Sequence, residues 1–274
     1  MKHGFYGIAE QTHTPDDTAR CAEEISIRGY TVVPDLLSQA ALVELRHKID
    51  AVYELQEKAF GKEALSAIGE LDACRSPLLY DFAFADVAQH PIALKVVRRL
   101  LGDWFILNLQ NSVINRAGKD HQQGVWHRDL PYQNFVVSTP IAINVLWAVD
   151  EFSDDTGGTY VLPFSHKLAV LPSDAYIINN QLVVAASAGS AILFDSMLIH
   201  RAGTNRSPSA RRAINHVYTT PIIKQQYDFP RALAHMQDVI DPQLQRLLGF
   251  TSQVPIDDKA WRYARSARLK GAGR

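Results

Sequence analysis

The sequence predicts a mainly β core with helices before and after it. In the first 102 residues, apolar residues recur every three or four positions, a spacing typical of amphipathic helices. From Trp104 onward the chain changes to short runs rich in β-branched and aromatic residues, separated by loops such as SDDTGG. Because no helical segment separates these runs, they favour an antiparallel sandwich or barrel over a doubly wound parallel sheet.

The helical N-terminal part, about residues 1–102, contains segments with recognisable start and stop signals. They open after the Thr-Pro-Asp-Asp stretch, at Ser38 and at Pro91, all favourable helix starts, and Gly29 and Gly102 end two of them. A short strand, YTVV, follows the first helix. The predicted helical segments are 14–29, 38–60 and 90–103.

The predicted strands lie in a core of about residues 103–222, and a helical tail of about residues 223–274 follows it. We expect a single domain over residues 1–274, since no stretch resembles a linker. The predicted strand segments are WFILNLQNSVIN, GVWHRD, IAINVLWAVDEF, GTYVLPFSH, QLVVAAS, GSAILFDSMLIH and RRAINHVYTTP.

Composition limits the class of partner. A chain of 274 residues, 47% of them hydrophobic, can bury one sizeable core. Its formal net charge of −1 creates no field that would favour nucleic acid or a membrane surface. Cys21 and Cys74 form neither a CxxC motif nor a disulfide framework, and no signal peptide is visible. We therefore expect a cytoplasmic monomer or homodimer that acts on a small molecule.

The segment GVWHRDLPY places two possible metal ligands one residue apart. In a strand, His127 and Asp129 project to the same side, because alternate residues share a face. A third ligand is predicted at His200, which closes the segment AILFDSMLIH and precedes a turn. Two histidines and one carboxylate are the facial triad of non-haem iron(II) oxygenases, which leaves three coordination positions open.

A basic residue beyond this triad suggests the co-substrate. Iron(II) needs an electron source to activate dioxygen, commonly 2-oxoglutarate, whose distal carboxylate requires a fixed cation. Arg211 lies eleven residues after His200 at the start of the next strand, and a guanidinium can donate two charge-assisted hydrogen bonds to a carboxylate. Arg212 and Arg206 are the competitors. Arg212 faces the opposite side of the strand, and Arg206 lies in a loop.

Together these motifs resemble the phytanoyl-CoA dioxygenase (PhyH) family, whose members are iron(II)/2-oxoglutarate oxygenases. The resemblance covers about residues 20–250 and preserves the order and spacing of the motifs. It implies a double-stranded β-helix core (a jelly roll, cupin-like). LQRLLGF, near residue 250, is similar to a signature of the branch that modifies natural products, which suggests secondary metabolism. The motifs are HRD (127–129), DDTGGTYVLPFSHK (154–167), FDSMLIHRAGTNRS (194–207) and Arg211.

The resemblance implies further site residues. Gln110, seventeen residues before His127, matches a glutamine that binds the co-substrate in some members. Trp147 matches an aromatic residue that lines the co-substrate pocket, and Thr159 matches a residue whose hydroxyl donates a hydrogen bond there. Ala202 stands where several relatives have a serine. Buried Gln and Trp residues also commonly serve packing, so a structural role remains open for both.

The resemblance also implies the reaction. Halogenating relatives have a small residue where this chain has Asp129, so we expect hydroxylation, with desaturation or ring closure as variants, and no chlorination. The cofactors implied are Fe(II), 2-oxoglutarate and O2. Arg128 and residues 132–134 could face a substrate, whose identity the sequence does not reveal.

Two alternatives use the same residues differently. A zinc-dependent hydrolase could use His127, Asp129 and His200 to activate water. That reading leaves Arg211 without a role. A non-catalytic jelly-roll binding protein would not need three metal ligands and an anion site together.

Overall fold

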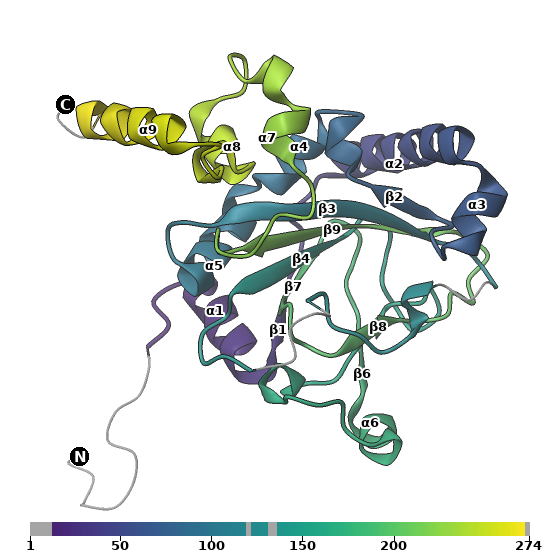
Figure 1. Cartoon of the computed structure of the whole chain (residues 1–274). Coiled ribbons are helices and arrows are strands. Elements are labelled where there is room, and N and C mark those ends of the chain that lie inside the picture. Colours follow the sequence, from purple (N-terminus) through teal and green to yellow (C-terminus); the bar gives the residue numbers. More distant parts are fainter. Residues whose placement is uncertain (1–12, 119–121, 131–135, 272–274) are drawn as a thin grey trace, which may run out of the picture. The chain divides into compact units, whose positions relative to one another are not determined.

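The computed structural model describes residues 13–118, 122–130 and 136–271 (Figure 1). Among these residues the chain separates into two compact units, one ending at Tyr227 and the other starting at Asp228. The first unit contains every strand described below. The prediction of a single domain over the whole chain stays a prediction.

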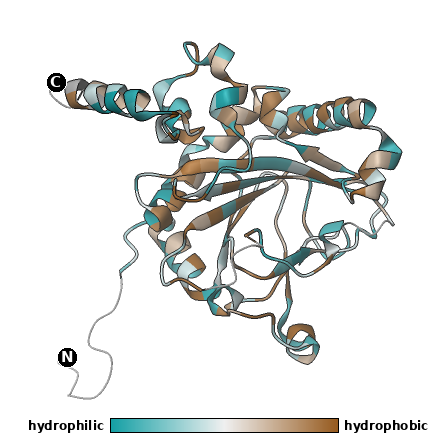
Figure 2. Cartoon of the chain, viewed as in Figure 1, coloured by the Kyte–Doolittle hydropathy of each residue, from teal (hydrophilic) through white to brown (hydrophobic). Residues whose placement is uncertain are grey.

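Most strands of the first unit form one antiparallel six-stranded sheet. Its strand order is β1-β7-β4-β9-β3-β2, so segments from both ends of the unit lie side by side. Figure 2 shows hydrophobic and hydrophilic segments mixed along these strands. The strands are β1 (Tyr30–Val33), β2 (Ala73–Arg75), β3 (Ile106–Asn115), β4 (Ala142–Ala148), β7 (Ala191–Asp195) and β9 (Arg211–Thr219).

A smaller antiparallel sheet faces the inner side of the large one. It has the order β6-β5-β8, from β5 (Thr159–Val161), β6 (Leu182–Val184) and β8 (His200–Ala202). Residues from both sheets line one pocket: Val113 and Ala213 come from the large sheet, and Thr159 and Ala202 from the small one. Two antiparallel sheets that enclose a site between them form the double-stranded β-helix, or jelly roll, expected from the sequence.

Helices cover the outer side of the large sheet (Figure 1). The Tyr218 hydroxyl of β9 donates to the Ala88 carbonyl (2.6 Å), and the ring of His90 packs edge-on against Trp147. The helices of this unit are α1 (Asp17–Arg28), α2 (Gln39–Phe60), α3 (Lys62–Ala67), α4 (Phe84–Ala88), α5 (Pro91–Leu101) and α6 (Asp174–Asn180).

The helix boundaries in the N-terminal part agree with the sequence signals. The Ser38 side chain accepts a hydrogen bond from the Ala41 amide (3.2 Å) and thereby caps α2. Gly29 ends α1 with φ of 95°, a conformation that glycine adopts without steric cost. This part also contributes β1 and β2 to the two edges of the large sheet, so it is not purely helical.

Two predicted strands differ from the structure. GVWHRD forms only a single bridge to β8 rather than a strand, through His127 and His200. GSAILFDSMLIH forms two strands in different sheets, because the chain turns after Asp195, whose carboxylate accepts from the Met197 amide (2.9 Å). His200 therefore opens β8 instead of closing the preceding strand.

The second unit, residues 228–271, is helical but interrupted. Asp241 caps one of its helices by accepting hydrogen bonds from the amides of Gln243 (2.9 Å) and Leu244 (3.0 Å). Most of the described side chains of the C-terminal helix are exposed. Its α-helices are α7 (Phe229–Ala232), α8 (Pro242–Leu247) and α9 (Asp258–Gly271).

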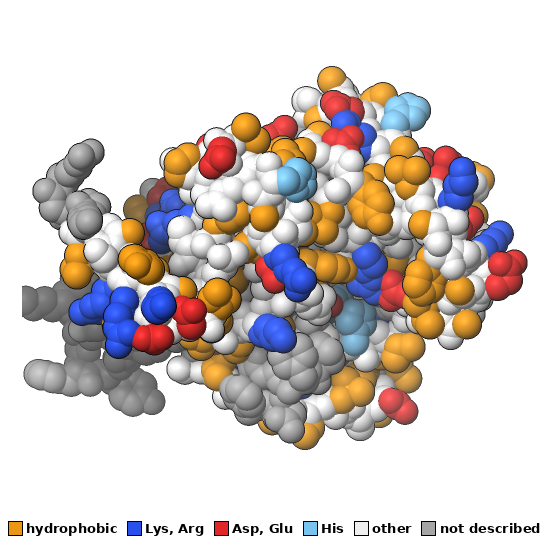
Figure 3. Space-filling view, turned by 45° about the horizontal axis from the view of Figure 1, so that its top comes forward, with side chains coloured by type: hydrophobic (Ala, Val, Ile, Leu, Met, Phe, Trp, Pro, Cys, Tyr) orange, Lys and Arg blue, Asp and Glu red, His pale blue; other side chains and the backbone are white. Residues whose placement is uncertain are grey.

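On the face shown in Figure 3, acidic and basic side chains are interspersed with hydrophobic ones. Cys21 and Cys74 are both free and buried. Within the described ranges, no helix has the length and apolar character that crossing a bilayer requires.

A buried histidine behind the large sheet makes stability depend on pH. Burial lowers the pKa of His216 to about 3, against about 6.5 in an unfolded chain. Between these values only the unfolded chain takes up the proton, so the stabilisation present above pH 6.5 is lost as the pH falls. The expected loss is about 1.4 kcal/mol per pH unit, or about 2 kcal/mol between pH 6.5 and 5.

Urea unfolding of wild type and His216→Gln between pH 5 and 7 tests this dependence. Burial raises the pKa of Asp195 to about 6, which acts in the opposite direction, so the difference between the two proteins isolates His216. The variant should lose less stability on acidification than wild type does. Parallel curves for the two proteins would contradict the assignment.

Candidate metal centre and co-substrate pocket

Three side chains that are distant in sequence meet in the pocket between the sheets. One ligand atom from each of His127, Asp129 and His200 lies within 4.8 Å of the others. Asp129 Oδ1 is 3.6 Å from His127 Nε2 and 3.8 Å from His200 Nε2. The two nitrogens and the oxygen surround a common point, so this donor set fits one metal ion.

Backbone carbonyls orient both imidazoles toward this point. His127 Nδ1 lies 2.7 Å from the Val125 carbonyl oxygen, and His200 Nδ1 lies 2.9 Å from that of Leu198. A carbonyl can only accept, so each Nδ1 carries the proton and each Nε2 presents a lone pair. Burial also lowers the pKa of His200, which keeps its ring neutral and able to bind a metal.

The two histidine segments are fastened to each other through the backbone. The His127 amide donates to the His200 carbonyl and the His200 amide donates to the His127 carbonyl, both at 3.0 Å. On the other side of this pair, the Arg201 guanidinium lies over the rings of Trp126 (5.1 Å) and Tyr160 (4.0 Å). These contacts fix the spacing of the two imidazoles.

Asparagines from two strands hold the carboxylate. The amides of Asn144 on β4 and Asn215 on β9 both donate to Asp129 Oδ2, the latter at 3.1 Å. Ser196 in turn donates to Asn144 Oδ1 (2.5 Å). The sequence reading missed these residues. The only signals were an asparagine within the otherwise apolar strand β4 and a second asparagine in β9, each at an inward-facing position.

Arg211 is a buried cation without an anionic partner in the described part of the chain. Its side chain lines the same pocket and is only 4% exposed. It donates to the Gly157 carbonyl (2.9 Å) and lies over the Phe152 ring (4.2 Å), but its buried Nε has no hydrogen-bond acceptor. Burial lowers its pKa to about 10, which still leaves it protonated at neutral pH. A buried, unpaired guanidinium fits an anionic ligand.

The loop that carries Gly157 fixes the arginine in place. Gly157 has φ of +72°, and a Cβ there would meet the Gly203 carbonyl oxygen at 2.6 Å and Asn115 Nδ2 at 2.7 Å. Asn115 Nδ2 donates to the same Gly203 carbonyl (2.9 Å). The TGG sequence is therefore needed for close backbone approach beside Arg211.

The remaining pocket lining is mixed in character. Thr159 lines the same pocket from the small sheet, where it pairs in register with Ala202. The residues that line the pocket are Val113, Gln123, His127, Asp129, Leu146, Thr159, Phe194, His200, Ala202, Arg211, Ala213 and Asn215.

The structure does not bring Gln110 or Trp147 to this pocket, which corrects the expectation for both. Each lies on the outer face of the large sheet, because it is next in sequence to a residue that faces inward. The Gln110 amide contacts the Phe84 carbonyl (2.9 Å) and His216 (2.8 Å), and Trp147 donates to His216 Nδ1 (3.1 Å). On β3, Asn111 rather than Gln110 shares the inner face.

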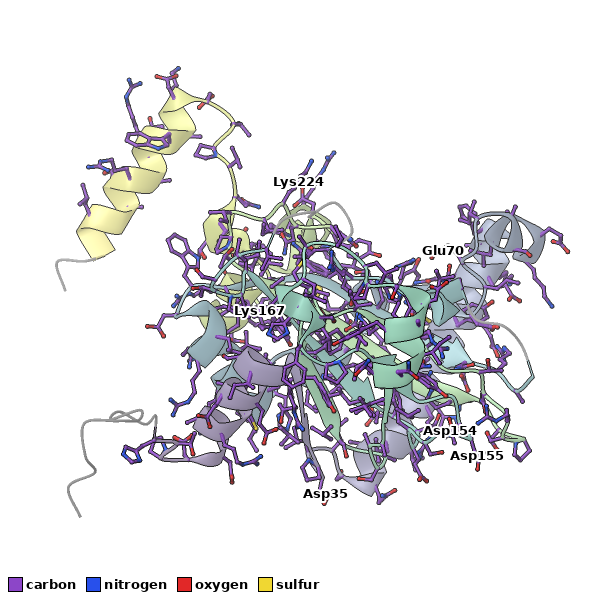
Figure 4. The ribbon with its side chains drawn as sticks, turned by 90° about the horizontal axis from the view of Figure 1, so that it is seen from below. Asp35, Glu70, Asp154, Asp155, Lys167 and Lys224 are labelled. Carbon is purple, nitrogen blue, oxygen red and sulfur yellow. The ribbon has the colours of Figure 1, made fainter. Side chains whose placement is uncertain are left out.

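The two competing arginines point away from the pocket. Arg212 forms ion pairs with Asp50 (2.7 Å) and Asp150 (3.1 Å) behind the sheet. Arg206 is exposed and pairs with Asp154 at 2.6 Å. Figure 4 shows Asp154 at the periphery of the molecule.

Of the residues suggested as substrate contacts, only Arg128 falls within the described ranges. Its guanidinium donates to the backbone carbonyls of Leu168 (2.6 Å), Ala169 (3.3 Å) and Met197 (3.2 Å). It therefore ties a neighbouring loop to the site. Residues 132–134 lie outside the described residues.

Residues 27–213 match the family "Phytanoyl-CoA dioxygenase (PhyH)". The uncharacterized protein Rv1501 of Mycobacterium tuberculosis is 39% identical over 236 residues, covering 82% of this chain and 84% of that protein. Dioxygenase af480 of Aspergillus fumigatus is 26% identical and covers 81% of this chain and 74% of its own.

Solved structures show the same fold. EctD from S. alaskensis, solved with 2-oxoglutarate and 5-hydroxyectoine, has a TM-score of 0.62 at 20% identity and covers 77% of this chain and 79% of its own. The epimerase SnoN, solved with Fe3+, alpha ketoglutarate and nogalamycin RO, has a TM-score of 0.60 at 18% identity, covering 76% of this chain and 85% of its own. The sequence match spans most of the fold and includes the triad, and on this evidence the chain belongs to the phytanoyl-CoA dioxygenase family.

Proposed function

We propose that this protein is an iron(II)- and 2-oxoglutarate-dependent oxygenase that acts on a small molecule. The observation that carries the proposal is Arg211, a buried cation without an acidic partner among the described residues, in the same pocket as the triad. A metal site alone fits several chemistries. A metal site beside an unsatisfied guanidinium fits a chelating dianion such as 2-oxoglutarate.

The metal would be held by His127, Asp129 and His200. Imidazole and carboxylate ligands suit iron(II), and three protein ligands leave positions for other groups. When bound, iron with 2-oxoglutarate and O2 supplies the oxidising power to functionalise an unactivated C–H bond. The protein's own residues orient the ligands, bind the co-substrate and exclude water.

The co-substrate would lie between the triad and Arg211. The Arg211 guanidinium would bind its distal carboxylate, and Thr159, which lines the same pocket, could add a hydroxyl hydrogen bond. Leu146 and Phe194 supply apolar walls, which strengthen electrostatic interactions by excluding water. Ala202 cannot donate the hydrogen bond that a serine would provide.

The reaction we propose is hydroxylation, with desaturation or ring closure as variants, in natural-product metabolism. Dioxygenase af480 and the nogalamycin epimerase SnoN share the family or the fold, which supports a small-molecule substrate. We also propose a cytoplasmic monomer or homodimer. A zinc hydrolase on the same triad would leave Arg211 as a buried charge without function.

Removing any one triad ligand should abolish metal binding. His127→Ala, Asp129→Ala and His200→Ala each remove one of three donors, while the fold should persist because the ligands line a pocket rather than the core. Metal binding is measured as the iron content after anaerobic loading with Fe(II), and the integrity of the fold is measured by thermal melting. His47→Ala, at an exposed position on α2, is the matched control. A triad variant that retains full iron content would show that ligand to be misassigned.

Arg211→Ala should weaken 2-oxoglutarate binding and spare the metal. Each charge-assisted hydrogen bond contributes roughly 1.5–3 kcal/mol, and 1.4 kcal/mol is a factor of ten. The apparent KM for 2-oxoglutarate should therefore rise by about two orders of magnitude. Arg212→Ala is the control, since its ion pairs lie behind the sheet. The KM of each variant is obtained by measuring succinate release at increasing 2-oxoglutarate concentrations. The same KM for the two variants would refute the role of Arg211.

Gly157→Ala should disturb the anchor of Arg211. The left-handed φ costs about 1–2 kcal/mol for a non-glycine residue, and the contacts at 2.6 and 2.7 Å add about 1–3 kcal/mol of overpacking. Gly61→Ala is the matched control, because Gly61 has φ of +96° with nothing within 4 Å. Only Gly157→Ala should also raise the KM for 2-oxoglutarate, by about tenfold or more. If both variants lost equal stability and kept the wild-type KM, the loop would have no such role.

A further inference from the structure

The two oxygens of the Asp129 carboxylate have different surroundings. Oδ1 faces the Nε2 atoms of His127 and His200, at 3.6 and 3.8 Å. Oδ2 accepts hydrogen bonds from the side-chain amides of Asn144 and Asn215. A carboxylate oxygen has two lone pairs, and two amide donors occupy both of those on Oδ2. Only Oδ1 is left to bind a metal.

The surrounding hydrogen bonds fix which way the amides face. Ser196 Oγ donates to Asn144 Oδ1 (2.5 Å), and Asn144 Nδ2 donates to Asn215 Oδ1 (3.0 Å). Both amide oxygens are therefore satisfied elsewhere, and both nitrogens point at Asp129 Oδ2. A rotated amide would bring an oxygen against the carboxylate and lose these bonds.

The same serine also holds the Asp129 backbone. The Asp129 amide donates to the Ser196 carbonyl (3.1 Å), while Ser196 Oγ orients Asn144, whose amide holds the Asp129 side chain. The result is a closed ring of hydrogen bonds. Asn144 and Ser196 are fully buried, so solvent does not offer these groups alternative partners.

We propose that Asn144 and Asn215, oriented by Ser196, are positioning residues that restrict Asp129 to ligation through one oxygen. This inference rests on the proposed iron and 2-oxoglutarate chemistry. A six-coordinate metal with three protein ligands has three positions left, of which a chelating 2-oxo acid takes two and dioxygen one. A carboxylate that bound through both oxygens would occupy one of these positions. The asparagine pair thus keeps the coordination sphere open.

The test compares Asn144→Leu with Asn108→Leu. Leucine has the same number and branching of side-chain heavy atoms as asparagine but no hydrogen-bond donor. Asn108 is a buried asparagine near the start of β3. Its side-chain amide donates to the Thr219 hydroxyl (3.3 Å) and to the Lys224 carbonyl (3.0 Å). A merely structural role would give the two variants the same behaviour. Because either substitution can lower the stability of the protein, the readouts are the Kd for Co(II) and the infrared spectrum of the carboxylate.

For the infrared measurement the protein carries aspartate labelled with ¹³C at the side-chain carboxylate. Spectra of the Co(II)-bound protein minus the metal-free protein report the carboxylate that changes on binding. One-oxygen ligation separates the asymmetric and symmetric stretching bands widely, and two-oxygen ligation brings them together. Wild type and Asn108→Leu should show the wide separation. Asn144→Leu should show a narrower one, and its Kd should rise by about 10–100-fold.

Ser196→Ala provides a milder perturbation should Asn144→Leu fail to fold. It removes only the hydroxyl that orients the Asn144 amide, so the Kd should rise by about threefold to tenfold with partial narrowing of the bands. If Asn144→Leu, or Ser196→Ala in its place, matches Asn108→Leu in both Kd and band separation, the inference is overturned. If wild type itself binds no Co(II), the proposed function fails instead.

Discussion

The reciprocal backbone hydrogen bonds between His127 and His200 are the constraint on which the site depends. They join a segment that is not part of any strand to the edge of the small sheet, and they do so at the two residues that carry the imidazoles. Each ring is then turned by a carbonyl two residues earlier in the chain. The main chain thus sets the relative position of the two imidazoles, and the contacts of Arg201 with the rings of Trp126 and Tyr160 add to this.

A second constraint is the burial of an uncompensated charge. Removing a guanidinium from water is costly, and the Gly157 carbonyl satisfies only part of Arg211. This cost arises in a pocket that is also lined by His127, Asp129 and His200, the three side chains that could bind a metal. We interpret the pairing of these two features as one binding site for a ligand that touches both the metal and the cation.

The sequence predicted those parts of the site that have a strong local signal. The triad and Arg211 follow from residue type and spacing, and the caps at Ser38 and Gly29 predicted two helix boundaries. Gln110 and Trp147 were misplaced because a side chain's face depends on strand register, and a shift of one residue reverses it. Asn144 and Asn215 were not predicted, because a single asparagine within a strand has no distinctive pattern until its partner carboxylate is located.

The central claim is that one pocket binds a metal and 2-oxoglutarate together. The most direct measurement is an anaerobic titration of the Fe(II)-loaded wild-type protein with 2-oxoglutarate, followed by visible absorption. Chelation of iron(II) by a 2-oxo acid produces a charge-transfer band. The account predicts a band that saturates at one 2-oxoglutarate per chain and is absent without either component. Iron binding without such a band, at any 2-oxoglutarate concentration, would contradict it.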